Sequence, residues 1–209
     1  GETTRVNVSG ITRGYSGASR PGHFDGVTTI VSKLWAVLGP CVAVFGQKDY
    51  QQLKVIERMT RDLLFPVQID GHPIVREADG LALSSRNTYL SAPDRSQALA
   101  IPRALSAAHG AFESGERSTR VLRETVRGAL DRAGLRIDYV ELGHPDSLEP
   151  FEDDATLPDE VFLAVAAFSG RTRLIDNVVL GRDAAPLGHA APQSHSAPQG
   201  HSAPHGAPA

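Results

Sequence analysis

Apolar residues in the first third of the chain follow two alternating patterns, which restrict the fold to few architectures. Residues 24–38 carry them at intervals of three and four, as an amphipathic helix does. Residues 41–45 form a short continuous apolar run, which predicts a strand covered on both faces. Residues 50–64 repeat the helical spacing, and the strand-like segment 65–69 follows. Helix, strand, helix and strand in this order predict an α/β unit with a parallel sheet.

The pattern changes near residue 90, where two helical stretches rich in Ala and Arg are followed by three strand-like segments. These five segments lie at residues 94–112, 119–133, 137–142, 161–168 and 172–180. Two helices and three strands predict a small α+β domain with an antiparallel sheet, which we place at residues 91–183.

The last segment, residues 184–209, consists almost wholly of Ala, Pro, Gly, His, Ser and Gln. It has little apolar surface to bury against the entropy lost on ordering, so we expect a disordered tail. Its four histidines are separated by prolines and offer no fixed geometry for a metal ion.

The composition is that of a globular protein with one or two cores: 41% of the 209 residues are hydrophobic and 22% are charged. A net charge of −3 gives no reason to expect nucleic acid or an anionic membrane as a partner. No apolar run approaches the roughly 20 residues that span a bilayer, so we expect a cytoplasmic protein. The single cysteine, Cys41, is interpreted as a small buried hydrophobe rather than a reactive thiol.

Polar residues follow the predicted strand 41–45, where the chain turns into a helix. Ligands of α/β sheets bind at the carboxyl ends of strands, so this turn is a candidate site. Gly46 allows the backbone to bend, Lys48 supplies a positive charge beside the helix N-terminus, and Gln52 lies one turn later on the same face. A phosphate suits this arrangement, and Asp49 either caps the helix or accepts hydrogen bonds from a ligand. The alternative is that Lys48 and Asp49 form only a solvated helix start.

A second polar segment contains Ser84, Ser85 and Arg86. The hydroxyl groups are donors and the guanidinium is a permanently charged fork, so the segment suits the oxygens of a polyphosphate. Judged alone, it is equally well a Ser-rich loop with a surface arginine. The charged residues just upstream are interpreted as a solvated turn. They are Arg76, Glu77 and Asp79.

Three segments in order resemble the pantothenate synthetase family of the nucleotidyltransferase superfamily: RPGHFDGV, FGQKDYQQL and READGLALSSRN. The resemblance extends over residues 1–183. It implies a cytoplasmic, homodimeric ligase that condenses pantoate with β-alanine through a pantoyl adenylate, using ATP and Mg²⁺. It also implies that residues 1–90 are part of a Rossmann-like nucleotide-binding domain.

The same resemblance implies roles for single residues. Lys48 and Arg86 would be catalytic, since they would offset charge growing on the departing diphosphate. Gln52 would hold pantoate, whereas no side chain of the chain is assigned to a metal ion. The residues implied to contact ATP are Gly46, Gln47, Lys48, Asp49, Val75, Leu83, Ser84, Ser85 and Arg86.

One element of the family has no counterpart, because the four histidines before residue 184 do not form its HxGH-type motif. We therefore expect the chain to be the later part of a longer enzyme, without activity of its own. The alternative is a non-catalytic module that binds ATP or phosphate, or that dimerises. His23 is interpreted as a structural residue at a helix start rather than as a substrate contact.

Overall fold

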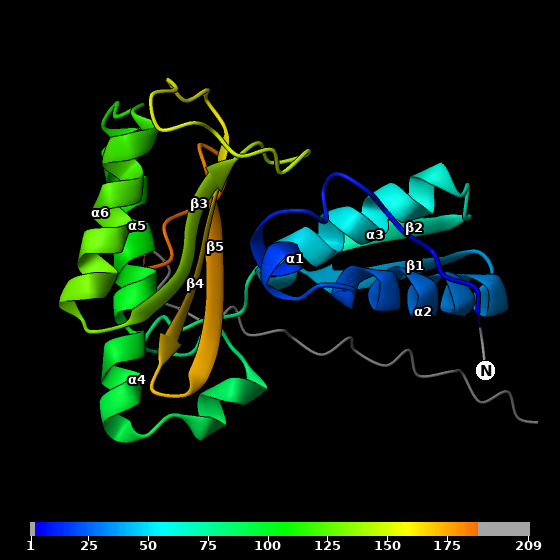
Figure 1. Ribbon diagram of the computed structural model, residues 1–209, viewed down its shortest axis with the longest axis horizontal. Coiled ribbons are helices and arrows are strands. Elements are labelled where there is room, and N and C mark those ends of the chain that lie inside the picture. The colour runs from blue at the N-terminus through cyan, green and yellow to red at the C-terminus, as the bar shows by residue number, and fades with distance from the viewer. Residues whose placement is uncertain (1–2, 188–209) are drawn as a thin grey trace, which may run out of the picture.

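The computed structural model describes residues 3–187, which form two units that are each built around one sheet (Figure 1). The parallel-sheet unit contains α1 (Tyr15–Ser19), α2 (His23–Leu38), β1 (Cys41–Gly46), the 3-10 turn η1 (Gln47–Asp49), α3 (Tyr50–Asp62) and β2 (Val67–His72). The antiparallel-sheet unit contains α4 (Ala92–Ala98), α5 (Ala100–Glu113), α6 (Thr119–Arg132), β3 (Arg136–Gly143), β4 (Val161–Ser169) and β5 (Thr172–Leu180). Between them lies the 3-10 turn η2 (Ser85–Tyr89). This order of elements confirms the predicted α/β fold.

In the parallel-sheet unit, α2 and α3 pack against each other and against the same face of the β1–β2 sheet. The two strands are parallel, with Cys41 of β1 opposite Val67 of β2. The buried side chains of this core are Val31, Trp35, Ile56, Met59 and Val67. Trp35 Nε1 donates a hydrogen bond of 3.1 Å to Thr60 Oγ1, which joins the two helices.

The prediction that β1 is covered on both faces is wrong for the part of the chain that the structure describes. Its side chains alternate, so Ala43 and Phe45 face the helices while Val42 and Val44 are 62% and 61% exposed. The physical reason is that α2 and α3 both lie on one side of the sheet. A continuous apolar run shows that both faces suit burial, but it does not show which of them the chain itself covers.

In the antiparallel-sheet unit the strand order is β3-β4-β5, and α5 and α6 cover one face (Figure 1). Fully buried side chains between helices and sheet include Leu105, Phe112, Leu122, Val126, Leu130, Leu142, Leu163 and Leu180. The other face of the sheet packs against the parallel-sheet unit. There the rings of Tyr50 and Phe162 stack at a centroid distance of 4.4 Å and an interplanar angle of 19°. Both faces of β4 are therefore buried, one in each interface.

The end of the described chain, at residue 187, contacts α5. Leu187 N donates a hydrogen bond of 3.0 Å to Ser106 Oγ, so the first residues of the predicted tail make contacts with the rest of the chain. Pro186 is buried and Leu187 lies beside Gly80, which provides apolar contact just before the Ala- and His-rich sequence. The rest of that prediction, including the four histidines, lies outside the described residues. Within residues 3–187 no helix has the length and apolar character needed to cross a membrane.

Candidate active site

A cavity of about 400 Å³ opens between the two units. Its walls come from α1, the start of α2, the turn between β1 and α3, η2 and all three antiparallel strands. Four residues of the predicted site line it: Lys48, Asp49, Gln52 and Arg86. Two sequence motifs from separate segments therefore meet at one cavity.

The turn between β1 and α3 differs in detail from the prediction. Gly46 has φ −74° and ψ 134°, a conformation that any residue adopts. The chain therefore bends at η1 and not at the glycine. A Cβ at this position would meet no atom within 4 Å, so the space beside Gly46 is open. Asp49 occupies the N-cap position of α3, but its side chain makes no capping hydrogen bond. Of the two predicted roles for Asp49, the structure does not show the capping role, and the carboxylate is available to a ligand.

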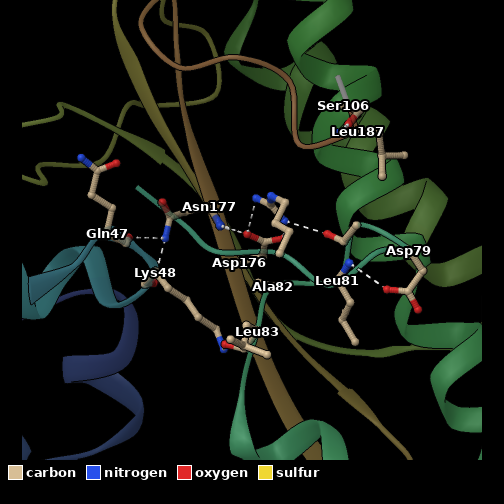
Figure 2. A network of polar contacts seen from close by, with 12 residues as sticks. Gln47, Lys48, Asp79, Leu81, Ala82, Leu83, Ser106, Asp176, Asn177 and Leu187 are labelled. Atoms are coloured by element: carbon tan, nitrogen blue, oxygen red, sulfur yellow. Dashed lines mark hydrogen bonds and ion pairs between the residues drawn. The ribbon is translucent and has the colours of Figure 1, made fainter. Parts of the chain in front are cut away.

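Lys48 joins the two motifs directly, since its Nζ donates a hydrogen bond of 2.9 Å to the carbonyl oxygen of Leu83 (Figure 2). Burial lowers the pKa of the Lys48 amine below its ordinary value. The carboxylates of Asp49 and Asp176 oppose this shift, whereas the Arg86 guanidinium adds to it. The ammonium is thus partly desolvated and faces a second cation, so an anion bound between Lys48 and Arg86 would relieve both costs.

The segment that carries Arg86 is folded back on itself. Arg76 and Ala82 form an antiparallel bridge around a turn at Gly80, whose φ of +90° favours glycine. The hydroxyl of Ser84 accepts a hydrogen bond of 3.2 Å from Arg86 N and caps η2. This local structure places the Arg86 side chain at the cavity.

Six residues predicted to contact ATP do not line the cavity: Gly46, Gln47, Val75, Leu83, Ser84 and Ser85. The side chain of Gln47 donates a hydrogen bond of 3.0 Å to Gly71 O in the sheet. Val75 and Leu83 are 53% and 54% exposed. Their contacts with ATP stay predictions.

The interpretation of Arg76, Glu77 and Asp79 as a solvated turn is wrong for Arg76 and Glu77, which are half-buried, whereas Asp79 is exposed but also has a partner. The guanidinium of Arg76 forms an ion pair with Asp176, while Arg95 donates hydrogen bonds to both Glu77 and Asp79. A hydrogen bond from Asn87, together with the one from Arg95, lowers the pKa of Glu77. The charges of this turn have partners that come from distant segments, which local sequence patterns do not reveal.

Several cavity residues were not predicted: Arg20, His23, Tyr139, Phe162, Arg173, Asp176 and Asn177. His23 begins α2, as expected, but it also lines the cavity, and burial together with nearby Arg20 lowers its pKa. The RPGHFDGV segment was a signal that could have identified it. The strand residues gave no such signal, because the apolar pattern around them indicates only a buried strand.

Comparison with known proteins agrees with this architecture. The model of the pantoate-beta-alanine ligase family matches residues 2–179. A pantothenate synthetase of Geotalea uraniireducens is 52% identical over 186 residues, which cover 88% of this chain and 64% of that protein. One of Anaeromyxobacter dehalogenans is 53% identical over 177 residues, with 85% and 60% covered. The chain thus spans somewhat less than two thirds of these relatives.

Solved structures show the same likeness in three dimensions. A pantothenate synthetase of Thermus thermophilus superposes with a TM-score of 0.78 at 43% identity, covering 85% of this chain and 64% of that one. A ligase from Francisella tularensis, complexed with beta-gamma ATP and beta-alanine, gives a TM-score of 0.61 at 28% identity, with 85% and 58% covered. From the family match and these identities, the chain belongs to the pantoate-beta-alanine ligase family.

Proposed function

We propose that this chain forms the phosphate- and pantoate-binding part of an enzyme that condenses pantoate with β-alanine. ATP activates pantoate as pantoyl adenylate, and the products are pantothenate, AMP and diphosphate. The observation that carries the proposal is that Lys48, Gln52 and Arg86, from two separate motifs, line one cavity. A binding module without catalysis would not need a pantoate-binding residue beside two phosphate-binding cations.

The charges of the cavity suit the first chemical step. The carboxylate of pantoate must approach the α-phosphorus of ATP, and both groups are anionic. Lys48 and Arg86 would hold the phosphates and offset the charge that grows on the departing diphosphate. The β-alanine amine would then attack the activated acyl carbon and release AMP, so no covalent bond to the protein is needed.

Pantoate itself fits the chemistry of the remaining cavity wall. Gln52 offers amide groups one helical turn after Lys48, and Arg20 adds a positive charge for a carboxylate. Phe162 and Ile175 supply apolar surface that suits the two methyl groups of pantoate.

Mg²⁺ is proposed to arrive bound to the phosphates of ATP. Within residues 3–187 no group of three or more His, Cys, Asp or Glu side chains could hold a metal ion. Mg²⁺ usually keeps several waters and binds through one or two carboxylates together with substrate phosphates. In the described part of the chain two carboxylates line the cavity, and since Asp176 is paired with Arg76, Asp49 is the one that could take this part.

We also propose a domain boundary near residue 90, a cytoplasmic location and a homodimeric assembly. The two cores on either side of η2 support the boundary. The location and the dimer rest on membership of the family alone.

The proposal predicts that the 209-residue chain binds Mg·ATP more tightly than AMP. Because Lys48 and Arg86 would contact the phosphates beyond the α-position, we expect the affinity for Mg·ATP to be at least about tenfold higher. Isothermal titration calorimetry with each nucleotide measures this. Equal affinities, or heat that matches buffer for both nucleotides, would contradict the proposed site.

A further inference from the structure

Strand β5 of the antiparallel-sheet unit packs against both turns of the candidate site, η1 and η2. Asn177 is 5% exposed, and its Nδ2 donates hydrogen bonds of 3.1 Å to Gln47 O and 2.9 Å to Lys48 O (Figure 2). One amide group of β5 therefore binds two consecutive carbonyl groups of the turn that carries Lys48.

The residue before it holds the other segment. Asp176 is 2% exposed and pairs with Arg76 through two hydrogen bonds, of 2.7 Å and 3.0 Å. Arg76 also donates to Gly80 O at 3.0 Å, across the turn of the segment that leads to Arg86. The backbone N of Asn177 donates to Asp176 Oδ1 at 2.8 Å, which fixes the orientation of the carboxylate.

Adjacent residues of a strand point to opposite faces, and their Cα atoms lie about 3.8 Å apart. Asp176 and Asn177 can therefore hold two different segments while keeping the spacing between them constant. Neither side chain belongs to the motifs that carry the candidate phosphate contacts.

We infer that Asp176 and Asn177 are positioning residues, which hold the Lys48 turn and the Arg86 segment at the separation that one triphosphate requires. This inference rests on the proposed function, because it assigns a purpose to the spacing of two proposed phosphate-binding cations. It differs from a role in general stability by predicting a local effect at the Lys48 amine.

The test uses Asn177→Leu in the 209-residue chain, since leucine has a similar size but no donor. The chain has three lysines, Lys33, Lys48 and Lys54, so ¹³C-dimethylation gives an NMR signal for each. In the variant the turn loses both hydrogen bonds and the Lys48 amine becomes more hydrated. We expect its titration midpoint to move up towards that of a free lysine, whereas Lys54 on α3 is unchanged. We expect the affinity for Mg·ATP to fall about tenfold.

Asn7→Leu is the matched control, because Asn7 is exposed and its amide donates to Asp25 away from the cavity. It should change neither the Lys48 titration nor the affinity. If leucine does not fit at position 177, Asn177→Ala removes the same donors without added bulk. A Lys48 titration that stays as in the unchanged chain, or an undiminished affinity where the unchanged chain binds Mg·ATP, would overturn the inference even if thermal stability fell.

The outcomes also separate this inference from the proposed function. If the unchanged chain does not bind Mg·ATP but Asn177→Leu still shifts the Lys48 titration, Asn177 does hold the Lys48 turn, whereas the proposed function and the purpose assigned to the spacing fail. If the unchanged chain binds Mg·ATP and Asn177→Leu does so equally well, the positioning role fails and the proposed function stands.

Discussion

Lys48→Ala is expected to lower the affinity of the chain for Mg·ATP by about 10²-fold, and adenylate formation in an enzyme that contains it by about 10² to 10³. The substitution removes the ammonium that the structure places at the cavity beside Arg86. That charge is partly desolvated, so its attraction to a phosphate is stronger than it would be in water. Titration calorimetry measures the affinity, and diphosphate release measures the chemical step.

Lys54→Ala is the control for this prediction. Lys54 lies on α3, which directly follows the turn that carries Lys48, but outside the cavity, and its Nζ lies 3.1 Å from both Glu57 and Asp146. Its removal should leave nucleotide affinity within about twofold of the unchanged chain, because a pair with an exposed carboxylate contributes little. Near-normal affinity in Lys48→Ala, or an equal loss in both variants, would remove the proposed role of Lys48.

The second large effect is expected in the core of the antiparallel-sheet unit. Leu122 on α6 is fully buried between the helices and the sheet. Leu122→Ala should lower the free energy of unfolding by about 2–5 kcal/mol, because it removes buried methyl groups and leaves a cavity. Urea denaturation followed by circular dichroism measures the change.

Leu34→Ala is the control for Leu122→Ala, because it makes the same substitution at another helical position. Leu34 lies on α2 but is 48% exposed, so the same substitution should cost less than about 1 kcal/mol. Both residues are in helices, where leucine and alanine have similar propensities, so the difference isolates burial. Similar losses in the two variants would show that this core is not the main source of stability in its unit.

Much of the fold could be predicted because hydrophobic periodicity is a local signal. The predicted segments at 161–168 and 172–180 agree with β4 and β5 to within one residue. The predicted helix 94–112 is instead divided at Leu99 into α4 and α5. Pro102 lacks the N–H that would bond to the carbonyl of residue 98, which explains the interruption.

The candidate site was predictable where a motif carried it and not elsewhere. Lys48 and Arg86 stand in segments with glycine, hydroxyl and charged residues at turns, and the structure brings both to one cavity. Arg76 pairs with Asp176 on β5, which is 100 positions away. The carbonyl group of Lys48 accepts a hydrogen bond from Asn177 on the same strand, which is 129 positions away. Such long-range contacts depend on how the two units pack, and no local spacing encodes them.

Whether Lys48 and Arg86 bind the phosphates of one nucleotide can be seen in a crystal structure of the chain with Mg²⁺ and a non-hydrolysable ATP analogue. We expect phosphate oxygens within about 3.2 Å of both Lys48 Nζ and the Arg86 guanidinium. A triphosphate bound outside the cavity, or one that contacts neither group or only one of them, would contradict it.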